Sequence, residues 1–440
     1  MPHTGTTWRL RRKAIYYAVH VHPCFFQEAP TISPNTPREK DLPIEPIPRS
    51  PDAAPASSAG GGAIAISVGH AANDMYVSLL PPLLPLFAAN LGLSHTQAGM
   101  LSLLRQLPAL LQPVLGHLAD RIDLRYLVIL APTITGIMTS FLHLSPNYMV
   151  MVLLLTLAGL STSAFHAIAP TLATNHAQTG SVGRGMALWV FGGEMGFTIG
   201  PLLVVTLVQH WSINSMPVLL VLGLAASVYM AVRLRTVPHR DMGISRPLPW
   251  YLALSQVRSV MLPLTYLTAA RSLAFSALSS YLPMLLSESG AGLWLGGASL
   301  TVYQAAGSLG VLLGGSLSDR VGRREIILGS MILSPLFLFA ALALNGVGQL
   351  LALAAVSLVG FTFTPVALAI VQESSIQNRA LATSVYLSLS FLLQALATAL
   401  VGALGDWIGL ASAFRIGAVT LLLGSPLTFL LPKSPSPNRS

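Results

Sequence analysis

Long apolar runs dominate the chain between residues 63 and 431, and short polar breaks separate runs that are each close to the length of a bilayer-spanning helix. A helix needs about 20 apolar residues to cross the hydrocarbon core. Backbone groups in lipid must be satisfied within the segment, so these runs are expected to be helices. The pattern predicts an all-α membrane protein with twelve transmembrane helices. The predicted spans are 63–89, 96–117, 126–145, 148–172, 185–208, 213–235, 259–286, 293–316, 325–344, 348–371, 380–403 and 411–431.

Composition and motifs exclude most soluble activities. Of the 440 residues, 53% are hydrophobic and only 9% are charged, against about 25% charged residues in soluble domains. The sequence has no phosphate-binding loop with Gly-Lys-Ser/Thr and no His/Cys cluster with metal-ligand spacing. We therefore expect no enzyme, no cofactor and no metal, and an ion or proton gradient as the source of energy.

The positive charges indicate topology rather than nucleic-acid binding, although the net charge is +9. With twelve spans, 21 of the 24 Lys and Arg residues fall on the side that also holds both termini, and the exceptions are Arg105, Arg271 and Arg415. Positively charged connections remain in the cytoplasm. Both termini are thus predicted to be cytoplasmic, in a multi-pass protein of the bacterial inner membrane.

Two polar segments divide the chain into predicted domains. The first 61 residues are rich in Pro, Ser and charge, and they are predicted to form a disordered cytoplasmic tail. A second polar, basic segment separates six spans from six. The predicted domains are therefore the tail 1–61, an N-terminal six-helix bundle 62–236, a cytoplasmic linker 237–258, a C-terminal six-helix bundle 259–432 and a tail 433–440.

A short motif recurs in the two halves. "GHLADRIDLR" at 116–125 follows the second span, and "GSLSDRVGRR" at 315–324 follows the eighth. A degenerate copy, "GALGDWIG" at 402–409, ends the eleventh span on the predicted opposite side and contains Asp406. Repeats that invert topology within a six-helix half are typical of secondary transporters.

The charged residues of the two cytoplasmic copies are candidate gating residues. Carboxylates at helix ends can pair with a helix N-terminus or a basic partner, and such pairs would hold the two bundles together when the outer side is open. The alternative is that the arginines only set topology. The candidates are Asp120, Arg121, Arg125, Asp319, Arg320, Arg323 and Arg324.

The repeated "G-x-L-A-D-R-x-x-x-R" pattern resembles the signature loop of the major facilitator superfamily. Within it, the chain looks most similar to the fosmidomycin-resistance group of exporters, on "GHAANDMYVSLLPPLLPLF" (69–87), "LLQPVLGHLAD" (110–120), "AFHAIAP" (164–170) and "GGEMGFTIGP" (192–201). The resemblance implies two six-helix bundles, alternating access and proton-coupled efflux.

Four ionisable residues lie near the middle of predicted spans, where charges are costly and usually functional. They are Asp74 in span one, Arg105 in span two, Glu194 in span five and Arg271 in span seven. His70, one helical turn before Asp74, titrates near physiological pH and suits proton exchange. Either these groups bind protons and substrate, or Asp74–Arg105 and Glu194–Arg271 are fixed structural pairs.

Other polar residues extend this candidate site. His166 in span four could shuttle protons or bind an anionic solute, and a packing role is the alternative. Asn73 and Tyr76 are expected to help line the pore beside the first-span carboxylate. Close helix packing is expected in span five, where small residues recur every four positions. That ladder consists of Gly192, Gly196 and Gly200, followed by Pro201.

The sequence thus predicts a secondary active transporter that exports a small organic or drug-like compound, such as fosmidomycin, by proton antiport. A proton-coupled uptake symporter and a non-transporting membrane receptor are the alternatives. The expected partners are a small-molecule substrate, protons and the lipid bilayer, with no nucleic acid, and the protein is expected to be monomeric.

Overall fold

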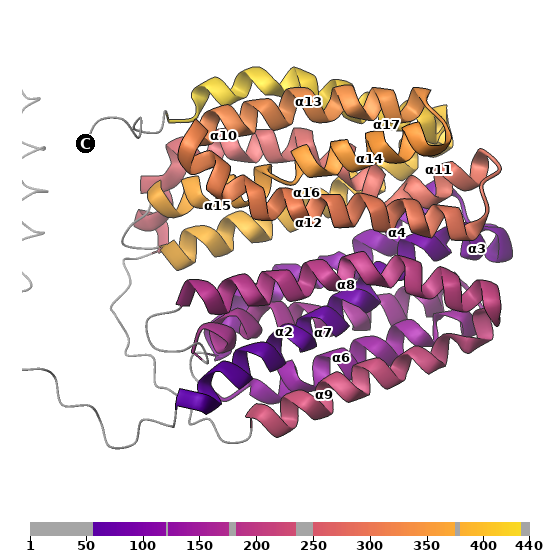
Figure 1. The fold of residues 1–440 in the computed structure, drawn as a ribbon, viewed down its shortest axis with the longest axis horizontal. Helices are drawn as coiled ribbons and strands as arrows, with labels where there is room; N and C mark the ends of the chain where they lie inside the picture. Colours follow the sequence, from indigo (N-terminus) through magenta and orange to yellow (C-terminus); the bar gives the residue numbers. More distant parts are fainter. Residues whose placement is uncertain (1–55, 120–121, 176–181, 235–249, 375–378, 433–440) are drawn as a thin grey trace, which may run out of the picture. The chain divides into compact units, whose positions relative to one another are not determined.

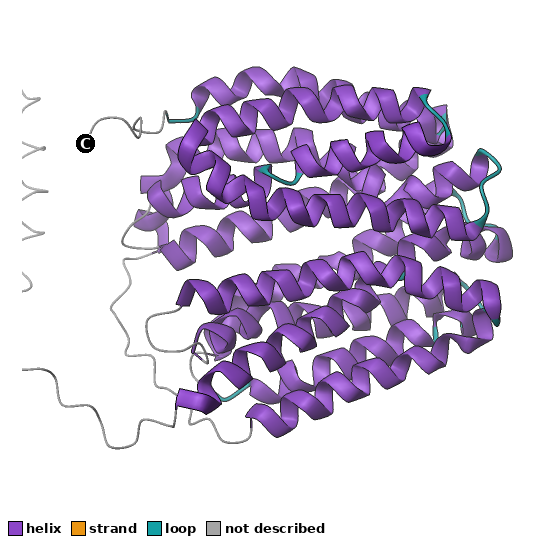
Figure 2. Ribbon diagram, in the orientation of Figure 1, coloured by secondary structure: helices purple, strands orange, loops and turns teal. Residues whose placement is uncertain are grey.

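The computed structural model describes residues 56–119, 122–175, 182–234, 250–374 and 379–432, and every structural statement below concerns these ranges. The chain divides into two compact units, 1–53 and 54–440, and the described residues belong to the second. Within them only helices, turns and loops occur (Figure 2), as expected for an all-α protein. The predicted N-terminal tail to residue 55, most of the predicted linker, Asp120 and Arg121 lie outside the described residues.

The helices follow the predicted spans closely. In the first half they are α2 (Ala56–Ser78), α3 (Leu80–Leu91), α4 (His95–Gln106), η1 (Leu107–Leu111), α5 (Gln112–Ala119), α6 (Arg125–Ser140), η2 (Leu142–Leu144), α7 (Tyr148–Asn175), α8 (Val182–His210), η3 (Ile213–Leu219) and α9 (Leu220–Leu234).

In the second half, the described residues are also mainly helical. It contains α10 (Trp250–Ser276), the π-helical turn η4 (Ala277–Tyr281), α11 (Leu282–Glu288), α12 (Leu293–Val321), α13 (Arg323–Ala343), α14 (Gly346–Gly360), α15 (Phe363–Ser374), α16 (Arg379–Ile408), α17 (Leu410–Gly424) and η5 (Ser425–Leu430).

Nine helical segments of the described residues are long and apolar enough to cross a bilayer. The other predicted spans are divided into shorter pieces, namely α2 with α3, α4 with η1 and α5, and α10 with η4 and α11. Proline explains much of this division, because it removes a helical hydrogen bond and crowds the preceding turn. Prolines stand at the start of α3, η1 and α11. A count of twelve spans stays a prediction.

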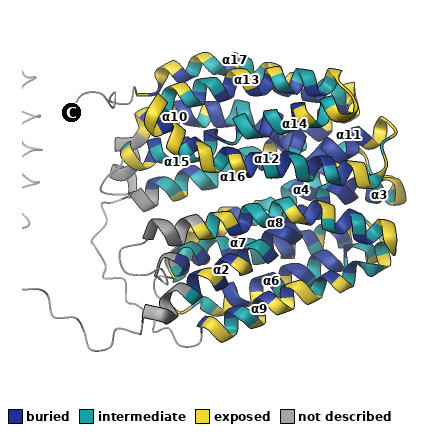
Figure 3. Cartoon of the chain, in the orientation of Figure 1, coloured by how far each residue is buried: buried dark blue, intermediate teal, exposed yellow. Residues whose placement is uncertain are grey.

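Many large apolar side chains are exposed, and exposed positions occur along the outer helices (Figure 3). Trp407, Leu423 and Val347 are 81%, 75% and 72% exposed, and many other leucines and valines are also exposed. Exposed apolar patches of this extent are not tolerated by a soluble monomer. The surface therefore fits a lipid environment, and the protein is an integral, multi-pass membrane protein.

Helices of the two halves meet mainly along two pairs, and α3 also packs on α11. α8 packs along α2 and also along α12, while α4 packs along α16 (Figure 1). Small residues permit the α8–α12 approach, because a Cβ on Gly297 of α12 would lie 3.0 Å from the carbonyl oxygen of Pro201 in α8. These helices position the candidate residues that lie between the halves.

Candidate functional site

Three titratable side chains converge between α2 and α7. His70 and Asp74 stand one turn apart on α2, and the His70 Nε2 lies 3.0 Å from Asp74 Oδ2. His166 of α7 completes the group, with its Nε2 3.1 Å from the His70 Nε2 and 3.6 Å from Asp74 Oδ1. We call His70, Asp74 and His166 the His–Asp cluster. His70 and Asp74 are buried, whereas His166 keeps some exposure.

The remaining ring nitrogens fix the protonation of both histidines. His70 Nδ1 lies 2.7 Å from the carbonyl oxygen of Trp189, and His166 Nδ1 lies 3.0 Å from that of Thr162. A carbonyl only accepts, so each Nδ1 carries a hydrogen, and each Nε2 of a neutral ring is a bare acceptor. Two bare acceptors cannot bond at 3.1 Å. The contact between the two Nε2 atoms therefore requires one additional proton, which would lie between the two rings and next to the Asp74 carboxylate.

Neighbouring residues hold the His–Asp cluster in place. The Trp189 ring stacks on His70 at 4.2 Å between ring centres. Asn73 donates to Asp74 Oδ1 at 3.0 Å and accepts from the Thr135 hydroxyl at 3.1 Å. Gly193 leaves room for the group, because a Cβ there would lie 2.7 Å from His70 Nε2. Of these residues, sequence reasoning singled out only Asn73.

The His–Asp cluster can hold a small cation as well as a proton. Its three ligand atoms all lie within 4.8 Å of one another, the one such group found in the described ranges. Two imidazoles and a carboxylate are donors that zinc and related ions accept. A proton shared between the two Nε2 atoms would give these atoms a hydrogen-bond partner without a metal ion.

Glu194 lies where the two halves meet. Its Oε2 accepts a hydrogen bond of 3.0 Å from the Ser308 hydroxyl of α12. Thr198, one turn further along α8, donates to the Glu194 carbonyl at 2.8 Å and lies 3.5 Å from the same serine hydroxyl. The carboxylate therefore contacts the second half through a hydroxyl group.

Neither predicted arginine partner is paired with these carboxylates. In the part of the chain that the structure describes, no ion pair joins Arg105 to Asp74 or Arg271 to Glu194, and the Nε atoms of both arginines are buried without a hydrogen-bond partner. Asp74 contacts histidines instead. The predicted alternative of two fixed Asp/Glu–Arg pairs is therefore not the arrangement found.

Tyr76 lies in the packed interior and is 1% exposed. Its hydroxyl donates to the carbonyl oxygen of Leu219 at 2.5 Å and accepts from the Gly223 amide at 2.9 Å. The tyrosine thus joins α2 to η3 and α9, on the side of the first half away from the second half's α12. This geometry gives it a packing contact rather than a place in a pore.

The glycine ladder of α8 lies directly on the α2 backbone. A Cβ on Gly192 would meet the Ser67 backbone, and one on Gly200 would meet Met75. Gly196 faces Asp74 of α2 in the same way. The ladder therefore sets the close approach of α8 to the helix that contains the His–Asp cluster.

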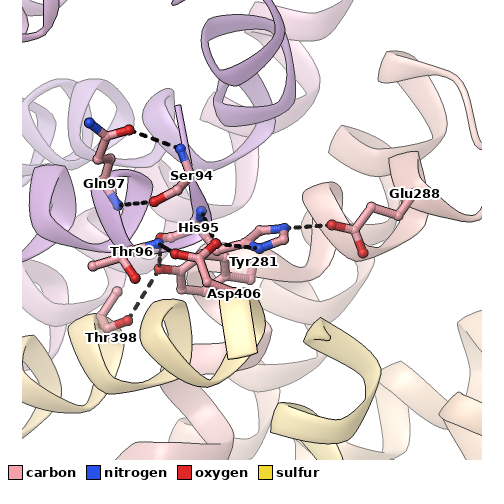
Figure 4. Close-up of polar contacts among 8 residues, drawn as sticks. All are labelled: Ser94, His95, Thr96, Gln97, Tyr281, Glu288, Thr398 and Asp406. Carbon is pink, nitrogen blue, oxygen red and sulfur yellow. Dashed lines mark hydrogen bonds and ion pairs between the residues drawn. The ribbon is translucent and has the colours of Figure 1, made fainter. Parts of the chain in front are cut away.

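A second polar group joins the halves at one end of α4 and α16 (Figure 4). Ser94 and Gln97 form a capping box at the start of α4, each bonding the other's backbone amide. Asp406 of α16 accepts from the backbone amides of His95 at 2.7 Å and Thr96 at 2.9 Å. A carboxylate from the second half thus caps the N-terminus of a first-half helix.

The His95 ring strengthens this contact. Its Nδ1 lies 2.9 Å from Asp406 Oδ1, and its Nε2 lies 2.6 Å from Glu288 Oε1 of α11. Both ring nitrogens face carboxylate oxygens, the arrangement of an imidazolium that donates from both. We call His95, Glu288 and Asp406 the end latch. Tyr281 adds to it by donating to the carbonyl oxygens of His95 and Thr398, at 2.9 and 3.3 Å (Figure 4).

Among the described residues, the ion pairs seen at the opposite helix ends join residues of the same half. Arg323 of α13 lies 3.4 Å from Asp319 of α12 and also pairs with Glu373 of α15. Arg125 pairs with Asp123 at 2.6 Å. Arg320 is exposed, and the Arg324 guanidinium lies 4.5 Å from the Phe429 ring centre. Of the two repeated aspartates in the part of the chain that the structure describes, Asp406 contacts the other half, through the end latch.

Sequence reasoning missed several residues of these sites. His95, Glu288, Ser308 and Trp189 were not singled out, because their roles depend on contacts between distant helices. One local signal was available: the Ser94–Gln97 spacing is the pattern of a capping box, which marks a helix N-terminus where an anion could bind.

The helices and their buried charges define a multi-pass α-helical membrane transporter, in which the two halves of the sequence meet at facing helices. The chain belongs to the Major Facilitator Superfamily, whose family model matches residues 66–310 and 267–440. It is therefore a transporter of a secondary-transport family rather than an enzyme.

Two curated relatives cover most of the chain. The Fosmidomycin resistance protein of Escherichia coli (strain K12) is 27% identical over 386 residues, which is 84% of this chain and 92% of that protein. The Uncharacterized MFS-type transporter YfnC of Bacillus subtilis (strain 168) is 25% identical over 390 residues, with the same two shares covered.

Solved structures show the same fold at low identity. A bacterial homolog of the human lysosomal transporter Spinster, inward-facing and unoccupied, matches with a TM-score of 0.68 and 16% identity, covering 85% of this chain and 97% of that one. A mutant of the nucleoside transporter NupG matches with a TM-score of 0.66 and 13% identity, covering 84% and 98%.

Proposed function

We propose that this protein is a proton-coupled secondary exporter of a small organic compound, of the kind that confers drug resistance. The His–Asp cluster carries the proposal. The contact between the two Nε2 atoms needs one proton more than two neutral histidines carry. Charged groups inside a membrane protein are costly and usually have a function, so this site is suited to proton binding. The name of the Escherichia coli relative supports efflux of a toxic compound over uptake.

The end latch supports alternating access. We propose twelve spans in two six-helix bundles with both termini in the cytoplasm, which places the end latch on the outer side of the membrane. The latch would then close the outer path while the His–Asp cluster communicates with the cytoplasm. Opening to the outside would require Asp406 to leave the α4 N-terminus, and the pairs around Asp319 would form contacts between bundles in that state.

Coupling is tested by separating gradient-driven movement from exchange. The first step is to find an expelled compound, by comparing growth with and without the gene on a panel of toxic compounds that includes fosmidomycin. The purified chain is then reconstituted in vesicles, and accumulation of the compound is measured with and without a pH difference. Asp74→Asn and Glu194→Gln should each reduce pH-driven accumulation by more than tenfold.

Exchange of labelled for unlabelled compound without a gradient should survive in Asp74→Asn, because it needs no net proton movement. Glu325→Gln is the matched control, since this exposed carboxylate lies in the first turn of α13. Wild-type accumulation in both Asp74→Asn and Glu194→Gln would refute the coupling role. Accumulation in the opposite direction would identify an uptake symporter, and binding without any accumulation would identify a receptor.

A further inference from the structure

Arg271 of α10 places a positive charge in an aromatic enclosure. Its guanidinium carbon lies 4.1 Å from the ring centre of Phe275, 5.3 Å from that of Phe363 and 5.8 Å from that of Phe361. Ring faces attract a cation, but each such contact stabilises it only modestly. The enclosure also removes water, so the charge depends on other partners for stabilisation.

Those partners are few. The Arg271 Nη2 donates to the Gly360 carbonyl at 3.3 Å, and its Nε is buried without a hydrogen bond. In the described ranges no carboxylate lies within the 4.0 Å of an ion pair with this guanidinium, although five other basic residues there do form ion pairs. An uncompensated buried charge is strongly destabilising. The site is therefore incomplete without an anion.

The two carboxylates near the middle of the helices, Asp74 and Glu194, do not neutralise the Arg271 charge in this conformation. Asp74 is held by two histidines, and Glu194 contacts Ser308 on α12. On α12, Tyr303 and Gly307 meet the Phe361 ring of the aromatic enclosure, and Ser308 is the residue after Gly307. One residue turns a helix by about 100°, so Ser308, with its contact to Glu194, lies on a different side of α12 from Gly307.

A second unsatisfied donor borders the same place. Tyr303 is fully buried, its ring meets the Phe361 ring edge-to-face at 5.5 Å, and its hydroxyl has no hydrogen-bond partner. Phe361 thus touches both the tyrosine and the Arg271 guanidinium. Arg271 as a whole residue is only partly buried, although its Nε is fully buried. The unpartnered Tyr303 hydroxyl and the Arg271 guanidinium, which lacks a partner at Nε, are together a donor pair suited to an oxyanion.

We infer that Arg271 and Tyr303 bind the oxyanion group of the transported solute, which is therefore a small organic anion such as a phosphonate, phosphate ester or carboxylate. Guanidinium offers parallel N–H donors that match two oxygens of one such group. The aromatic rings would contact the solute's carbon skeleton. That the bound solute is transported rests on the proposed function. Binding of the anion at Arg271 and Tyr303 does not depend on proton coupling.

Equilibrium binding to the purified full chain, in detergent without added phospholipid and without any gradient, tests the inference. The probes are fosmidomycin, which has a phosphonate group, its uncharged diethyl ester, methylphosphonate and benzoate. Arg271→Gln should weaken binding of the anionic probes by at least tenfold and leave binding of the ester unchanged. Arg271→Lys should give an intermediate loss, because lysine keeps the charge but not the planar fork.

Arg415→Gln is the matched control, since it removes an exposed arginine of α17 and should leave all binding unchanged. Tyr303→Phe keeps the packed ring and should weaken anionic probes alone, which provides a test even if Arg271→Gln does not fold. Equal binding of the anion by wild type and both Arg271 variants would overturn the inference, as would wild-type protein that binds no anionic probe or binds the ester more tightly. Loss of coupling in Asp74→Asn with normal Arg271 variants would sustain the proposed function alone.

Discussion

Replacing Asp406 by asparagine should open the end of the protein at which α4 meets α16. The carboxylate belongs to the second half, yet it accepts from two amides at the N-terminus of a first-half helix and from the His95 ring. Asparagine keeps one oxygen acceptor of similar shape but removes the negative charge. The change therefore weakens a contact between halves without creating a cavity.

The contact geometry sets the size of the effect. Hydrogen bonds to a charged group contribute about 1.5–3 kcal/mol each. The asparagine oxygen retains part of this, and the Asp406 side chain is 32% exposed, so solvent screening reduces the remainder. We expect a loss of about 1–2 kcal/mol in the latched state, which corresponds to an increase of about 5- to 30-fold in the open population.

Cysteine accessibility measures this shift. The sequence has one cysteine, so Cys24→Ser provides a background without reactive thiols. Thr398→Cys then places a thiol on α16 at a site that is 1% exposed, beneath the Tyr281 contact. The rate of reaction with a membrane-impermeant maleimide, measured in membranes with equal expression, should rise by the same 5- to 30-fold in Asp406→Asn.

Asp319→Asn is the control for this measurement. Its carboxylate occupies the related repeat position but is 67% exposed and contacts Arg323 within its own half. It should not raise labelling at Thr398→Cys. Equal labelling rates in wild type and Asp406→Asn would refute the reasoning, because the helix-capping contact would then contribute nothing to the balance between conformations.

Two stability predictions follow from packing. Tyr76→Phe should lower the free energy of unfolding by about 1–3 kcal/mol, because it leaves the buried Leu219 carbonyl and the Gly223 amide without their shared partner. Thermal unfolding in detergent measures this effect, and an unchanged unfolding midpoint would contradict it. Gly196→Leu should lower the unfolding temperature strongly and reduce the folded yield, because a side chain there meets the α2 backbone. Gly315→Leu is the control and should leave both quantities unchanged, because nothing lies within 4 Å of its Cβ position.

The sequence predicted local and periodic features well. The span ranges follow from apolar runs of bilayer length, which depend only on neighbouring residues. The His70–Asp74 contact follows from their spacing of one helical turn, and the close packing of α8 follows from glycines every four residues. Each of these is encoded within a single helix, so no knowledge of the fold is needed to find it.

Contacts between distant helices could not be predicted in the same way. The sequence suggested that Glu194 pairs with Arg271, because opposite charges at similar depth are a natural match. The structure instead turns Glu194 toward Ser308 of α12, and Arg271 lies against aromatic rings rather than against a carboxylate. Which faces meet depends on helix rotation and crossing, which small residues such as Gly297 set and which charge alone does not.

The two kinds of contact between halves suggest how one interface can move while another persists. Along α8 and α12, backbone approaches backbone at Gly297, and such packing cannot separate without losing dispersion contacts along the whole crossing. At the end latch, the contact consists of partly exposed hydrogen bonds to Asp406, for which water can substitute. Breaking the end latch therefore requires less free energy than separating α8 from α12. We expect the two halves to rotate about the α8–α12 crossing, which we call the pivot. Glu194 lies at that pivot, so a change in its hydrogen bond to Ser308 would act on both conformations from the position that moves least.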